Sequence, residues 1–169
     1  SFMLQVVKSL VPKFPNLLYV AAGEGETRQA IETEVQRLGL TRHVVLPGML
    51  NPVAPLIRRA DVLVMPSSYE PLGMSQIEAL GLGVPVVVSN VGGLPETVQS
   101  GITGHVCPAP HAPGALDAWV RALAAVLEEP QKARDMAAQG RQAVLAQFGK
   151  QSNIDGLVGT IQTPRLGRN

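Results

Sequence analysis

Two glutamates, Glu70 and Glu78, are separated by seven residues near the middle of the chain. The apolar run 61–65 before Glu70 predicts a strand, and the run 73–80 predicts a helix that contains Glu78. In open α/β sheets, ligands bind at the edge where strands end and helices begin. A carboxylate at Glu78 can accept both hydrogen bonds of a vicinal diol, such as the ribose of a nucleotide. The two glutamates therefore predict a ligand site at this edge.

The segment between the glutamates also predicts an anion site. The amides of Gly73, Met74 and Ser75 fall in the first turn of the predicted helix, where backbone donors have no partner within the helix. Such amides favour a bound anion. Gly73 lets the backbone approach a ligand closely, and Glu70 lies in the loop just before it.

Both glutamates also fit interpretations that need no ligand. Ser75 and Glu78 have the spacing of a capping box, in which Glu78 would only stabilise the start of the helix. Glu70 fits an ordinary solvated loop carboxylate. Farther along, Gly92-Gly93 fits a simple chain reversal nearly as well as a contact with substrate.

Short apolar runs alternate with longer amphipathic stretches, which is typical of repeated βα units. Helices are predicted at 2–12, 27–38, 51–60, 73–80, 115–128 and 131–148, a short helical turn at 95–98, and strands at 17–22, 43–46, 61–65, 85–89 and 104–107. The pattern predicts one Rossmann-like, doubly wound α/β domain over residues 1–158, followed by a disordered tail at 159–169. Because such a sheet normally starts with a strand and this chain starts in a helix, we expect its first strand to be absent.

Composition excludes several classes of protein. The chain has 169 residues, of which 46% are hydrophobic and 16% charged, so it is long and apolar enough to fold. Its net charge of +1 argues against a nucleic-acid partner. No apolar run reaches the roughly 20 residues of a membrane span, although peripheral membrane contact stays open.

The lone Cys107 excludes an internal disulfide and suits a reducing cytoplasm. The three histidines are too dispersed for a metal site, so we expect no metal and no cofactor.

The run 67–104 resembles the large family of retaining glycosyltransferases with the GT-B fold, which includes glycogen and sucrose synthases. The family pattern of two glutamates with seven residues between them, followed by G-x-P-V-V-x-S, V-G-G-x-P-E and G-x-T-G, stands here as Glu70 and Glu78, 83–89, 91–96 and 101–104. An isolated glutamate pair is a weak signal, but this ordered set is highly specific. The resemblance covers nearly the whole chain.

The resemblance implies roles for individual residues. Glu70 would hold or polarise the transferred sugar, and Glu78 would bind the ribose of the nucleotide. The amides of Leu72, Gly73 and Met74 would contact sugar hydroxyls or phosphate.

Two further turns match the family more loosely. The turn that contains Gly48 and Met49 resembles the segment that lines the nucleobase. Gly23, in the turn Gly23-Glu24-Gly25, begins like a dinucleotide-binding motif, but Arg28 stands where the third glycine belongs. We interpret it as a tight turn near the donor site.

The implied activity is transfer of a sugar, with retention and without a metal, from a nucleoside-diphosphate sugar such as a UDP or GDP sugar to an unknown acceptor. The family's Arg and Lys that clamp the pyrophosphate, and its N-terminal acceptor domain, would all precede Ser1. We therefore expect this chain alone to bind a nucleoside diphosphate weakly and to transfer no sugar. A non-catalytic nucleotide-sugar-binding or regulatory module is the alternative, and the broken glycine pattern disfavours a nicotinamide-dependent oxidoreductase.

Overall fold

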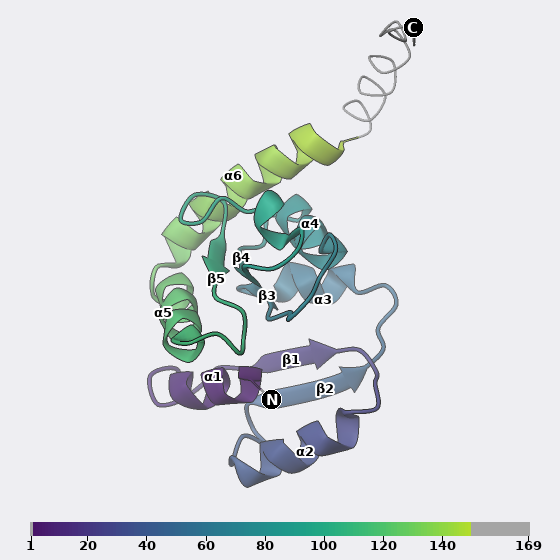
Figure 1. Ribbon diagram of the computed structural model, residues 1–169, viewed down its shortest axis with the longest axis vertical. Helices are drawn as coiled ribbons and strands as arrows, with labels where there is room; N and C mark the ends of the chain where they lie inside the picture. The colour runs from purple at the N-terminus through teal and green to yellow at the C-terminus, as the bar shows by residue number, and fades with distance from the viewer. Residues whose placement is uncertain (1, 150–169) are drawn as a thin grey trace, which may run out of the picture.

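The structure, a computed structural model, describes residues 2–149 (Figure 1). The helices are α1 Phe2–Leu10, α2 Arg28–Arg37, α3 Ala54–Arg59, α4 Met74–Gly81, the 3₁₀ helix η1 Leu94–Glu96, α5 Ala115–Glu128 and α6 Pro130–Phe148. The strands are β1 Tyr19–Ala22, β2 Val44–Gly48, β3 Leu63–Met65, β4 Val86–Ser89 and β5 His105–Cys107. The alternation of strands and helices confirms the predicted α/β class.

The strand β4 forms the centre of the larger sheet, which has the order β3-β4-β5 with all strands parallel. Every residue of β4 is buried, and its run Val86-Val87-Val88 has the continuous apolar character of a parallel strand covered on both faces. Val87 packs with Trp119 of α5 on one side, whereas Val86 and Val88 pack with Leu80 of α4 on the other. Helices therefore cover both faces of this sheet.

The smaller sheet contains only β1 and β2, which pair in parallel. Among the described residues, no strand joins β1 to β3, and Figure 1 draws β1 between β2 and the larger sheet. The residues of β3 are all half-buried although they are as apolar as those of β4, because β3 has one strand neighbour where β4 has two. The described residues therefore form two separate parallel sheets.

Helix α1 packs against both halves of the molecule. Met3, Val6 and Leu10 lie in the same buried cluster as Trp119 of α5. Leu4 and Val7, on the adjoining face of the helix, lie in a second cluster with α2 and β2. The one helix therefore connects the core of the larger sheet to the core of the smaller sheet.

Most elements begin or end one to three residues from the predicted bounds, and two of these differences have a clear physical reason. Strand β2 runs through Gly48, where the prediction ended it before Pro47, because Gly48 pairs with Ala22 after a shift in register. Helix α3 begins at Ala54 and not at Asn51, since its first hydrogen bonds are donated by Leu56 and Ile57 to the Val53 carbonyl. The proline in its first turn, where a missing N–H costs little, is Pro55. The predicted tail at 159–169 and the domain end at 158 lie outside the described residues.

The position of α1 predicts a large effect for Leu4→Ala. Leu4 is 1% exposed, so its truncation should lower the free energy of unfolding by about 2–5 kcal/mol. Urea denaturation followed by circular dichroism measures this change. Lys8→Ala, on the exposed side of the same helix, is the matched control and should change stability by less than about 0.5 kcal/mol. Equal stability of the two variants would contradict the role assigned to α1.

Candidate functional site

The first part of the site lies where β3 ends and α4 begins. The loop after Met65 leads to Gly73, which precedes the first residue of α4 and has a left-handed φ of 81°. Glycine adopts this conformation without the steric cost that other residues pay. The amides of Met74 and Ser75 follow at the start of the helix, and within the described part of the chain they have no hydrogen-bond acceptor. Both remain available as donors, as predicted.

The half-buried Glu70 is bonded to this turn. Its Oε1 accepts a hydrogen bond from the Gly73 amide at 3.1 Å. The Gly73 amide is therefore occupied, and the prediction that it is open to a ligand is wrong for the structure as it stands. The physical reason is that a carboxylate three residues before the N-cap residue can itself accept a hydrogen bond from the N-cap amide. The same bond holds the Glu70 carboxylate beside the two open amides.

Glu78 lies on α4, one turn beyond Met74, and its side chain is exposed. The alternative interpretation of Glu78 as part of a capping box is wrong, because the N-cap position is occupied by Gly73, which has no side chain, and not by Ser75. Met74 is 58% exposed, so the face of α4 that carries Met74 and Glu78 is open to solvent. Binding of ribose by Glu78 stays a prediction.

The turn Gly92-Gly93 contacts the loop of Glu70. The Gly93 amide donates a hydrogen bond to the Glu70 carbonyl at 3.1 Å. The turn is therefore more than a chain reversal, and its contact is with the loop that carries the predicted catalytic residue. Sequence reasoning missed this contact, and it also missed the fully buried Gln76 beneath it.

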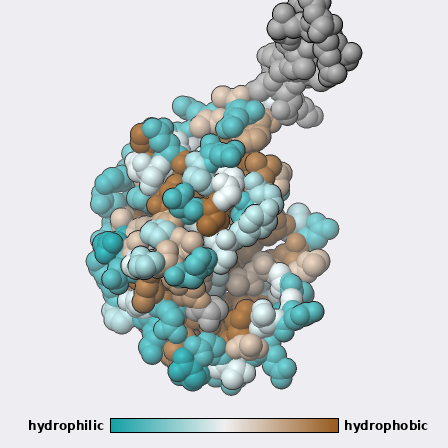
Figure 2. Space-filling view, viewed as in Figure 1, coloured by the Kyte–Doolittle hydropathy of each residue, from teal (hydrophilic) through white to brown (hydrophobic). Residues whose placement is uncertain are grey.

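The second part of the site lies at the ends of β1 and β2. The Gly23 amide donates to the Gly48 carbonyl at 2.8 Å, so the structure brings these two predicted residues together. Beside them lies a cavity of about 230 Å³, lined by residues 21–25, Thr27, Arg28, Ile31 and Leu46. Met49 follows directly and is 76% exposed. Figure 2 shows a recess on this side of the molecule with apolar, brown atoms in its walls.

Arg28 is the cation of this cavity, and sequence reasoning noted it only as the residue that breaks the glycine motif. Its Nη1 donates to Glu24 at 3.0 Å, its Nε to Glu32 at 2.9 Å and its Nη2 to the Leu46 carbonyl at 2.8 Å. The bond to Leu46 connects the start of α2 to β2, whereas the bonds to Glu24 and Glu32 are local. The guanidinium is engaged within the protein and does not stand free for a phosphate.

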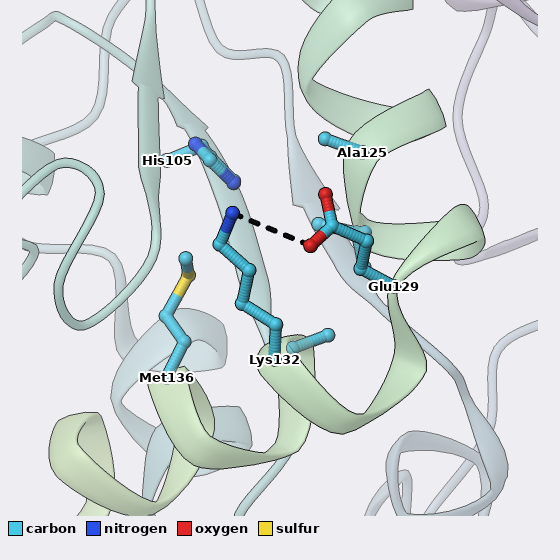
Figure 3. Close-up of a pocket in the computed structure, with 7 residues that line it drawn as sticks. His105, Ala125, Glu129, Lys132 and Met136 are labelled. Atoms are coloured by element: carbon cyan, nitrogen blue, oxygen red, sulfur yellow. Dashed lines mark ion pairs between the residues drawn. The ribbon is translucent and has the colours of Figure 1, made fainter.

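A second, smaller pocket lies between β5, α5 and α6 (Figure 3). Its volume is about 40 Å³, enough for a few water molecules at about 10–15 Å³ each and too little for a nucleotide. Lys132 Nζ lies 3.4 Å from Glu129 Oε2 there. Burial, and secondarily the charge of Lys132, lower the pKa of His105, which keeps its ring neutral at physiological pH. This pocket is a small gap between packed elements.

The described residues contain no group of three or more His, Cys, Asp or Glu side chains that could hold a metal ion. No helix among residues 2–149 is long and apolar enough to cross a membrane. The absence of a cofactor stays a prediction.

Parallel strands with helices on both faces define an α/β domain, and the candidate site lies at the carboxyl edge of its sheets. The chain belongs to the family described as glycosyl transferases group 1, which matches residues 1–143. The predicted family and fold are thereby confirmed.

Individual relatives cover most of this chain. Glycogen synthase of Mycobacterium tuberculosis is 36% identical over 140 residues, which is 82% of this chain and 33% of that protein. The 2-deoxystreptamine glucosyltransferase of Streptomyces kanamyceticus is 35% identical over 149 residues, 86% of this chain and 37% of the relative. The chain thus spans about a third of the length of these relatives.

Among solved structures, HepE of Anabaena in complex with UDP and glucose superposes with a TM-score of 0.81. The match covers 93% of this chain and 43% of HepE at 21% sequence identity. This likeness is one of fold, and it is the GT-B fold.

Burial raises the pKa of the Cys107 thiol to about 11, and nearby Arg121 lowers it by a smaller effect. The thiol of the folded chain should therefore resist alkylation by iodoacetamide at pH 8 and react only after unfolding in urea. Because an unfolded thiol ionises near pH 8.5, stability should be retained below about that pH and fall as the pH rises towards 11. Mass spectrometry of the alkylated protein tests the first point, and rapid alkylation of the native chain would contradict it.

Proposed function

We propose that this chain is the donor-binding domain of a retaining glycosyltransferase that transfers a sugar from a nucleoside-diphosphate sugar to an acceptor. The observation that carries the proposal is the bond from the Gly73 amide to Glu70, which holds a carboxylate beside two open amides at the start of α4. The family and the UDP complex of HepE support the choice of a nucleotide sugar.

The start of α4 supplies the anion site in this proposal. The Met74 and Ser75 amides donate to the phosphates, and the helix dipole adds about 0.3–1 kcal/mol for each charge it stabilises. Leu72, whose side chain is exposed, precedes Gly73 in the same loop before α4. Glu78, one turn along the exposed face, accepts the two ribose hydroxyls.

Transfer breaks the bond between the anomeric carbon and the diphosphate oxygen. The new bond to the acceptor hydroxyl oxygen forms on the same face, so the anomeric configuration is retained, and the hydroxyl proton passes to the departing diphosphate. Amides placed at the departing diphosphate stabilise its growing negative charge as the bond breaks. Glu70 holds the sugar through its hydroxyls while this happens.

The cavity beside Gly23 and Gly48 takes the nucleobase in this proposal, with Met49 at its rim. UDP is the first nucleotide to test, because HepE was solved with UDP. The acceptor binds outside this chain, which covers about a third of its relatives, and the chain alone binds the donor weakly and transfers no sugar. A cytoplasmic location belongs to the same proposal, supported by the lone cysteine.

Glu78→Ala tests the ribose site. In the full-length protein that contains this chain, the variant should bind UDP about ten- to hundredfold more weakly, since a lost charged hydrogen bond costs about 1.5–3 kcal/mol. Isothermal titration calorimetry measures the change. The control Asp117→Ala removes an exposed carboxylate from the first turn of α5 and should leave the affinity unchanged. An unaltered dissociation constant in a folded Glu78→Ala protein would remove Glu78 from the site.

Glu70→Gln tests the contact with the sugar. The variant should bind UDP as the wild type does, because UDP carries no sugar for Glu70 to contact. Its turnover number should fall by about 10² or more if the interaction strengthens in the transition state. Steady-state kinetics with a UDP-sugar panel separates the two quantities. Wild-type turnover would rule out this role.

A further inference from the structure

The turn of residues 91–94 and the loop of residues 70–73 pack backbone against backbone. The Gly93 amide donates to the Glu70 carbonyl at 3.1 Å. A Cβ added at Gly92 would lie 2.0 Å from that same carbonyl oxygen, and one at Gly93 would lie 2.4 Å from the Pro71 carbonyl oxygen. Both distances are below 3.0 Å, a limit that real Cβ atoms essentially never cross. Only glycines allow this approach.

The two glycines are needed for different reasons. Gly92 has a φ of 49°, in the left-handed region that disfavours other residues. Gly93 has a φ of −79° and a ψ of −5°, which any residue adopts. At Gly93 the requirement is therefore the close contact with the backbone of Pro71 and Leu72, and a substitution there tests this contact without straining its own backbone.

Gln76 of α4 is hydrogen-bonded to the turn of residues 91–94. Its side chain is fully buried, and its Nε2 donates to the Leu94 carbonyl at 2.9 Å and to the Thr97 hydroxyl. The contact continues at Gly73, where an added Cβ would lie 2.4 Å from Leu94 Cδ2. The start of α4 and the turn of residues 91–94 thus behave as one packed unit.

The position of Glu70 depends on this unit at two atoms. Its carbonyl oxygen is fixed by the Gly93 amide, and its carboxylate is fixed by the Gly73 amide. We propose that the turn of residues 91–94 is the positioning element for Glu70, with Gly93 and Gln76 as its positioning residues. The geometric part stands on these contacts alone, and its effect on transfer rests on the proposed function.

Positioning of this kind acts on turnover more than on nucleotide affinity. Displacing a reacting group by about 1 Å can lower a rate by about 10²-fold. An alanine at Gly93 requires a shift of the Pro71 carbonyl, and this moves the neighbouring Glu70 with it. The open amides of Met74 and Ser75 lie beyond Gly73 on α4, so the affinity for UDP should change little.

Kinetics of the full-length protein that contains this chain provide the first test. Gly93→Ala should lower the turnover number by about tenfold to a hundredfold while the UDP dissociation constant changes by less than about threefold. The matched control is Gly81→Ala, where no atom lies within 4 Å of the added Cβ and no left-handed φ is present. Wild-type turnover in a folded Gly93→Ala protein would overturn the effect on transfer, and the Gly73 resonance then decides whether the positioning contact itself stands.

The Gly73 amide resonance in a heteronuclear NMR spectrum of the protein provides a second test that needs no activity. Glu70→Ala gives the resonance of the unbonded amide, and Gly93→Ala should shift the Gly73 resonance towards that value. An unshifted resonance overturns the positioning contact. A shifted resonance with wild-type turnover leaves the contact standing and refutes instead the proposed role of Glu70 in transfer.

Gln76→Leu keeps the test decisive if Gly93→Ala does not fold. This change places an apolar side chain of similar size in the buried space and removes the donor to the Leu94 carbonyl. The Gly73 resonance and the turnover number should change in the same direction as in Gly93→Ala and by a smaller factor. Wild-type values for both would contradict the unit defined by Gln76, Leu94 and Gly73.

Discussion

The packing of α1 against two separate cores is the constraint on which the rest of the structure depends. Parallel sheets occur almost only where helices cover both of their faces. Here β1 and β3 each have one strand neighbour among the described residues, so the sheet itself does not connect the two halves. Met3 and Leu4, adjacent in sequence, enter different clusters and make that connection instead. The recess in Figure 2 lies where the sheet is interrupted.

This arrangement explains why the candidate site has two parts. The start of α4, with Glu70, belongs to the larger sheet, and the cavity beside Gly23 belongs to the smaller one. Each part follows the end of a parallel strand, which is where α/β sheets bind ligands. Anything that alters how α1 packs therefore alters one part of the site relative to the other.

The elements that the sequence predicted best are those whose apolar residues follow a local pattern. The helix at residues 115–128 matched its prediction at both ends, because its apolar positions repeat with helical spacing between clear boundaries. The bond between Glu70 and Gly73 was missed although the residues are close in sequence, since it depends on a left-handed turn that spacing does not specify. The contact between Gly93 and Pro71 was missed because the two residues lie on different loops, and no periodicity links them.

The charges of the described residues limit how strongly they can attract a phosphate. Arg28 lines the cavity, but its three donating nitrogens are bonded to Glu24, Glu32 and the Leu46 carbonyl. Using it for a phosphate would break bonds that hold α2 to β2. The start of α4 offers neutral amides, and an exposed helix start contributes only about 0.3–1 kcal/mol to a bound charge. Charge-assisted hydrogen bonds from a cation are about twice as strong as neutral ones. In the proposed function, a diphosphate held by the described part of this chain would therefore rely on geometry, and precise placement of Glu70 and the α4 amides would matter more than attraction does.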